Sequence, residues 1–137
     1  YFLGAQFSGD GRTLLMAHHP GVISQWEFDE SMKEPIQTGE YSGALMGYRD
    51  PVLSKDESRL FAGSGGEDAV SIWDFRSQQL LLTLKAPGIS STPVRISSSE
   101  RMIGRLSSSG DNIRIWRAPS WEEIGAEAPE REKERSK

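Results

Sequence analysis

The sequence predicts an all-β fold of three consecutive antiparallel units, and two markers that recur together predict it. Tryptophans close three short segments of alternating residues and lie 47 and 43 residues apart: Trp26, Trp73 and Trp116. A serine that opens a polar turn precedes each tryptophan by 18, 19 and 19 residues: Ser8, Ser54 and Ser97. Alternating segments bounded by turn residues are typical of strands, and a fixed period above forty residues is typical of repeat architectures.

Each unit contains the same succession of strands. One strand ends just before the serine, a second follows the polar turn, and a third ends at the tryptophan. The second strands are expected at 13–17, 60–63 and 102–106, and the third strands at 22–26, 70–73 and 113–116. A fourth strand is expected at 35–38 and at 79–85, and none after the third unit. The units therefore span 1–40, 41–86 and 87–118, each an antiparallel meander.

Three segments resemble the WD repeat: Ser-Gly-Asp-Gly-Arg at 8–12, Ala-Gly-Ser-Gly at 62–65 and Ser-Ile-Trp-Asp at 71–74. Units of that family are four-stranded propeller blades. The resemblance covers 2–118 and implies a partial β-propeller of three consecutive four-stranded antiparallel blades, the last lacking its outer strand. It assigns structural repeat positions to Trp26, Trp73, Asp74, Trp116, Asp68, Asp111, Ser8, Ser54 and Ser97.

The chain departs from the family pattern at several of these positions. Glu27 and Arg117 follow the first and third tryptophans, where the family prefers aspartate. The Gly-His pair that usually opens a repeat is missing from all three units. We therefore expect the blades to depend more on apolar packing than on the His–Ser–Trp–Asp hydrogen-bond network of well-formed repeats.

The two ends of the chain suggest a carboxyl-terminal fragment of a longer propeller, whose remaining blades would be its partners. Tyr1 begins on an innermost strand, which we interpret as a cut. Ser120 and Glu123 form a capping box, so 119–137 is expected to hold a short helix followed by a charged, disordered tail. The stretch 115–124 is also similar to the carboxyl ends of bacterial WD-repeat proteins, in which the propeller often follows a serine/threonine kinase.

Composition excludes several kinds of site. With 16 basic and 20 acidic residues, the chain has a net charge of −4, which argues against nucleic acid as a partner. The sequence contains no run of eighteen apolar residues, so no membrane span is predicted. The absence of cysteine excludes disulfides and thiolate sites. His18 and His19 are adjacent on a strand, so their side chains leave on opposite faces and cannot readily share a metal. No catalytic residue, metal or cofactor is predicted.

The sequence thus favours a non-catalytic scaffold that binds other proteins or peptides through its blade rims. An alternative is the regulatory or targeting propeller of a larger enzyme, such as a bacterial serine/threonine protein kinase. A third hypothesis is an enzyme with its site on the propeller channel, which would need inner-strand residues such as Asp50 and Arg95.

Overall fold

The computed structural model describes residues 2–29, 31, 33–43, 47–65, 70–86, 93–106 and 110–120. Every regular element within these ranges is a strand. The strands are β1 (Phe2–Phe7), β2 (Thr13–His18), β3 (Val22–Glu27), β4 (Ile36–Ser42), β5 (Tyr48–Leu53), β6 (Arg59–Ser64), β7 (Val70–Asp74), β8 (Leu80–Leu84), β9 (Val94–Ile96), β10 (Met102–Leu106) and β11 (Ile113–Arg117). The expected carboxyl-terminal helix and tail, and Asp68, lie outside the described residues.

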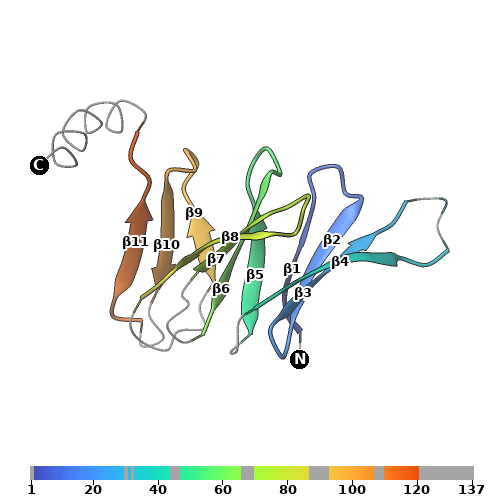
Figure 1. Cartoon of the computed structure of the whole chain (residues 1–137), viewed down its shortest axis with the longest axis horizontal. Coiled ribbons are helices and arrows are strands. Elements are labelled where there is room, and N and C mark those ends of the chain that lie inside the picture. The colour runs from blue at the N-terminus through green and yellow to red at the C-terminus, as the bar shows by residue number, and fades with distance from the viewer. Residues whose placement is uncertain are drawn as a thin grey trace, which may run out of the picture.

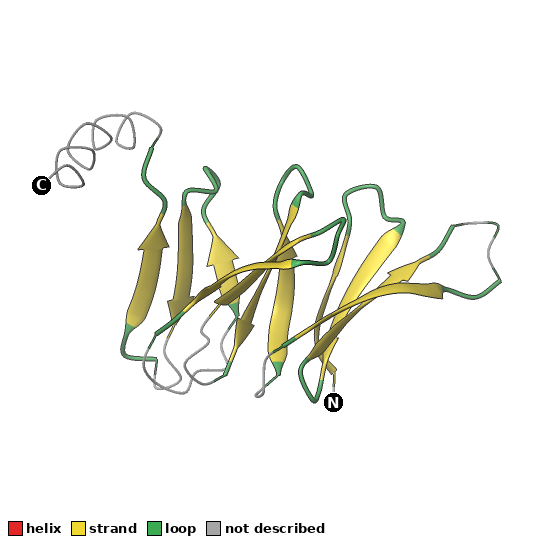
Figure 2. Ribbon diagram, in the orientation of Figure 1, coloured by secondary structure: helices red, strands yellow, loops and turns green. Residues whose placement is uncertain are grey.

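The strands form three antiparallel sheets, each in simple sequence order (Figures 1 and 2). The first is β1-β2-β3-β4, the second β5-β6-β7-β8 and the third β9-β10-β11. Within the described residues, the predicted all-β meander of four, four and three strands is therefore confirmed. Strand β4 is longer than the expected 35–38, because its pairing with β3 continues from Ile36 to Ser42.

The two outer strands share an irregularity opposite the repeat tryptophan. The register of β4 shifts between Gln25 and Trp26, and that of β8 shifts between Ile72 and Trp73. One residue of each outer strand is left without a partner there, which bends the strand and increases its twist. The first two sheets are thus alike in this detail as well as in strand order.

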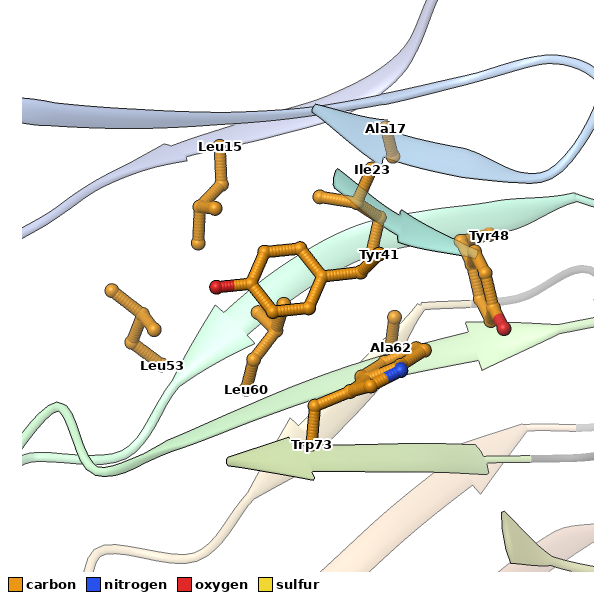
Figure 3. Packing of buried hydrophobic residues seen from close by; sticks show 9 residues of the cluster. All are labelled: Leu15, Ala17, Ile23, Tyr41, Tyr48, Leu53, Leu60, Ala62 and Trp73. Carbon is orange, nitrogen blue, oxygen red and sulfur yellow. The ribbon is translucent and has the colours of Figure 1, made fainter. Parts of the chain in front are cut away.

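The sheets stack through their first strands, since β5 lies against β1 and β2, and β9 lies against β5 and β6. Neighbouring residues of a strand point to opposite faces, so the middle sheet contributes one face to each interface. The larger core lies between the first and second sheets (Figure 3). Its buried members are Leu15, Ala17, Ile23, Tyr41, Tyr48, Leu53, Leu60, Ala62 and Trp73.

A smaller core joins the second and third sheets. Val70 and Val94 are fully buried there, and Ile72, Ile103 and Trp116 pack around them. The opposite faces of the two end sheets stay exposed, with Phe2, Phe7, Ile113 and Ile115 at 64%, 52%, 71% and 60% of their full accessibility. This pattern is typical of repeat units that bury their faces only against neighbours.

Candidate interaction surface

The turns between the first and second strands of the sheets lie along one edge of the molecule (Figure 1). We call them the first-hairpin turns and define them as 8–12, 54–58 and 97–101. The repeat serine organises each turn, because its backbone N–H donates to the carbonyl oxygen five residues later, and its hydroxyl oxygen accepts the N–H of that same residue. The distances are 2.9 and 3.0 Å for Ser8 with Thr13, 2.9 and 3.0 Å for Ser54 with Arg59, and 2.9 and 3.1 Å for Ser97 with Met102.

An aspartate two residues after the serine completes the first two turns. Asp56 Oδ1 accepts the Ser54 hydroxyl at 2.7 Å and the Ser58 N–H at 3.0 Å. These donors, the Ser54 hydroxyl above all, hold the pKa of the Asp56 carboxyl at about 2. Asp10 accepts the corresponding serine hydroxyl at 2.7 Å and the Arg12 N–H at 2.9 Å, and its pKa is lowered for the same reason.

The third turn replaces the aspartate with Ser99, whose hydroxyl lies 3.1 Å from that of Ser97. A neutral hydroxyl is a weaker partner than a carboxylate, so this turn has the same shape with a weaker internal network. The three repeat serines therefore act as turn organisers in the structure.

Trp73 is buried between two sheets. Its ring packs edge to face on Tyr48 of its own sheet at 4.9 Å and on Tyr41 of the first sheet at 5.9 Å. Such edge-to-face pairs are favourable beyond the area that they bury. The tryptophan is only 1% exposed, so it is unavailable to a ligand.

The other two repeat tryptophans occupy the corresponding faces of their sheets. Trp116 is half-buried against the second sheet, and Trp26 donates its Nε1–H to the Ser24 hydroxyl at 2.8 Å. The predicted turn residue Asp111 is exposed, and its Oδ1 accepts from Asn112 Nδ2 at 3.0 Å. The three tryptophans therefore do not gather into one site.

Asp74 closes the turn between β7 and β8 on the same edge as the first-hairpin turns. Its Oδ1 accepts the N–H and hydroxyl of Ser77 at 2.9 and 3.0 Å, and its Oδ2 lies 3.2 Å from Arg59 Nη1. The Ser77 donors chiefly, with the Arg59 charge, lower the pKa of this carboxyl. Asp74 thus ties the two turns of the second sheet together.

A pocket of about 400 Å³ lies between these two turns. It is lined by Asp56, Glu57, Ser58, Asp74, Phe75 and Arg76. The lining holds three carboxylates and one arginine, and Arg59 pairs with Asp74 at 3.2 Å, so negative charge remains in excess. The backbone N–H groups that bind Asp56 and Asp74 hold two of those carboxylates in place. The pocket can therefore present a fixed negative charge to a partner.

Tyr41 links the first two sheets and contacts Phe75 of the pocket lining. Its hydroxyl lies 2.8 Å from Gln25 Oε1 in the first sheet and 2.8 Å from the Phe75 carbonyl oxygen in the second. Burial, together with the nearby Asp74 charge, raises the pKa of this phenol. The Tyr41 ring also stacks on Phe75, with centroids 6.4 Å apart.

Sequence reasoning missed Tyr41, Glu57 and Glu100 as residues that join sheets. Tyr41 carried a usable signal, because an aromatic residue near the end of an outer strand that is mostly polar indicates one buried position. The two glutamates occupy the same place in successive turns, which was a second available signal.

Two candidate reaction centres can be checked among the described residues: a metal site and the inner-strand pair Asp50 and Arg95. They contain no group of three or more histidines and carboxylates placed to hold a metal ion. Asp50 and Arg95 lie on β5 and β9 and share no hydrogen bond or ion pair in the part of the chain that the structure describes. No helix long and apolar enough to cross a membrane occurs among these residues.

Comparison with known proteins gives a structural likeness and no sequence relative. No protein-family profile and no curated protein matches this sequence. A similar solved structure is the Cps50 (Swd1) β-propeller domain of Myceliophteria thermophila, with a TM-score of 0.69 and 13% sequence identity. The match covers 86% of this chain and 38% of that one. At this identity the likeness shows the fold alone: the three sheets have the architecture of part of a β-propeller.

Proposed function

We propose that this chain is part of a WD-repeat β-propeller that acts as a non-catalytic scaffold for other proteins or peptides. Its blades would be 1–40, 41–86 and 87–118, and the remaining blades of the propeller would be further partners. The single observation that carries the proposal is that the first-hairpin turns share one edge of the molecule. In each sheet the serine hydroxyl of the turn accepts the same backbone N–H, so the three turns are held in the same way. Rigid turns from several sheets on one edge form a preorganised surface, which lowers the entropic cost of binding.

The acidic pocket on this edge indicates the kind of peptide that would bind. The three carboxylates Asp56, Glu57 and Asp74 outnumber the two cations at this site, Arg76 in the lining and Arg59 paired with Asp74. A segment with exposed lysine or arginine is therefore complementary. The alternative of a regulatory propeller attached to a bacterial serine/threonine kinase rests on the similarity of 115–124 alone.

A selection from a random-peptide library on the immobilised chain tests the proposal. We expect basic peptides to be enriched and to bind more weakly as salt is raised. Arg76→Glu adds a fourth carboxylate to the pocket and should tighten binding by about threefold, the range of one exposed ion pair. Lys85→Glu makes the same change in net charge just beyond β8, away from the pocket, and should leave the affinity unchanged.

Two results would contradict the proposal. One is a selection that enriches no peptide above the level seen with an unrelated protein. The other is an equal response to Arg76→Glu and Lys85→Glu, since binding would then depend on net charge and not on this edge.

A further inference from the structure

The fourth residue of each first-hairpin turn has a left-handed backbone. The φ angle is 72° at Gly11, 54° at Glu57 and 58° at Glu100. The three residues also make the same backbone hydrogen bond, because the N–H of each donates to the carbonyl oxygen of the serine that opens its turn. Glycine adopts this conformation most easily, so glutamate at two of the three positions needs a compensating interaction.

Both glutamates make that interaction with the neighbouring sheet. Glu57 Oε1 accepts the backbone N–H of Gly9, and Glu100 Oε1 accepts the backbone N–H of Lys55 at 2.6 Å. Gly9 and Lys55 are each the second residue of their own first-hairpin turn. One bond thus recurs in register from the second sheet to the first and from the third sheet to the second. A carboxylate acceptor makes such bonds shorter and stronger than neutral ones.

The two ends of this series differ. Gly11 has no side chain, so the first turn offers no carboxylate of this kind. At the other end, Ser98 is the second residue of the third turn, and its N–H has no acceptor among the described residues. The Ser98 carbonyl oxygen already accepts from Lys55 Nζ at 2.5 Å, which holds this turn in place.

We propose that the first-hairpin turns form a directional connector between sheets, and that the Ser98 N–H is its open donor. The partner that fits is a further unit of the same kind with glutamate or aspartate at the fourth position of its own first-hairpin turn. The proposal rests on the proposed propeller, because it continues the packing of β5 on β1 and of β9 on β5. The exposed face of the third sheet, with Met102, Leu106, Ile113 and Ile115, would form the apolar part of the same interface.

The bonds within the chain can be tested by amide hydrogen exchange measured by NMR. Glu57→Gly removes the carboxylate and keeps the favoured backbone, so the variant should fold. We expect exchange at Gly9 to become at least about tenfold faster while exchange at Lys55 is unchanged, and Glu100→Gly should give the reverse pattern. Unchanged exchange at Gly9 and Lys55 in the two variants would overturn the connector.

The open donor can be tested with a second copy of this chain as the probe. Gly11→Glu supplies the missing carboxylate to the first turn, and Gly11→Gln is the matched control with equal size and the same backbone demand. Sedimentation equilibrium should show end-to-end association about fivefold tighter for the glutamate variant, because a charged acceptor is stronger than a neutral one.

Ser98→Pro removes the donor at the second residue of a turn, where the φ of proline fits. When Ser98→Pro is added to each variant, the Gly11→Glu and Gly11→Gln chains should associate equally tightly. Equal association of the glutamate and glutamine variants, or no effect of Ser98→Pro, would overturn the open donor. Gly11 and Ser98 do not line the acidic pocket. Peptide binding to the pocket can therefore fail or succeed independently of the association between copies of the chain.

Discussion

Replacing Tyr41 by phenylalanine isolates the hydrogen bonding that joins the first two sheets. The ring and its packing on Trp73 and Phe75 remain, and the hydroxyl is lost from between Gln25 Oε1 and the Phe75 carbonyl oxygen. A net hydrogen bond contributes about 1 kcal/mol, and a buried acceptor left without its donor costs about 1–3 kcal/mol. Since Phe75 is only partly buried, we expect a loss of about 1–2 kcal/mol in the free energy of unfolding.

Urea unfolding followed by tryptophan fluorescence measures this loss, because Trp73 lies against the mutated ring. The melting temperature should fall by about 5 °C. Tyr41→Leu is the companion variant: it also removes the aromatic pairs, each about 0.5–1.5 kcal/mol, and should cost about 3–4 kcal/mol in all. A loss below about 0.5 kcal/mol for Tyr41→Phe would refute the reasoning, since the hydroxyl would then contribute nothing between the sheets.

Three further predictions concern the first-hairpin turns and the close contact between Gly4 and Asp50. Ser54→Ala should lower the free energy of unfolding by about 1–2 kcal/mol in urea titrations, and Ser97→Ala by less, because the Ser54 hydroxyl binds a carboxylate and the Ser97 hydroxyl another hydroxyl. The pKa of Asp56 is about 2, below its unfolded value, so the contribution of this carboxylate to the free energy of unfolding is complete above about pH 4 and lost as pH falls through 2. Asp56→Asn should therefore make the free energy of unfolding depend less on pH between pH 4 and 2. The same pH dependence in the variant as in the wild type would contradict this. Gly4→Ala should lower the free energy of unfolding by more than about 2 kcal/mol, measured by thermal unfolding. The added Cβ would lie 2.2 Å from Asp50 Oδ1 and 2.9 Å from Asp50 Cα, at a φ of 142°. A melting temperature equal to that of the wild type would contradict this, since β1 and β5 could then move apart.

The sequence was sufficient to predict the strands whose residues alternate or end at a marker. The segments at 102–106 and 113–116 agree with β10 and β11 to within one residue, because apolar periodicity and the bounding turns are local signals. The extent of β4 was not predictable in the same way. Most of that strand is polar and exposed, so its length depends on pairing with β3 and not on its own pattern.

The contacts between sheets were harder to predict for a different reason. The bond from Glu57 joins residues 48 positions apart, and that from Glu100 joins residues 45 apart. Such contacts depend on how one sheet is placed on the next, which no single unit encodes. Asp74 shows a related limit: its place after Trp73 indicated a repeat position, and its actual partners, Ser77 and Arg59, follow from the geometry of two turns.

The middle sheet is the one that has a packed core on both of its faces, through Trp73 on one side and Val70 on the other. In a linear array, stability is a sum of unit terms and nearest-neighbour coupling terms. The middle sheet therefore takes part in both couplings of this chain, and each end sheet in one. Opening should then proceed inward from the ends, and the last protected amides on heating should belong to β6 and β7.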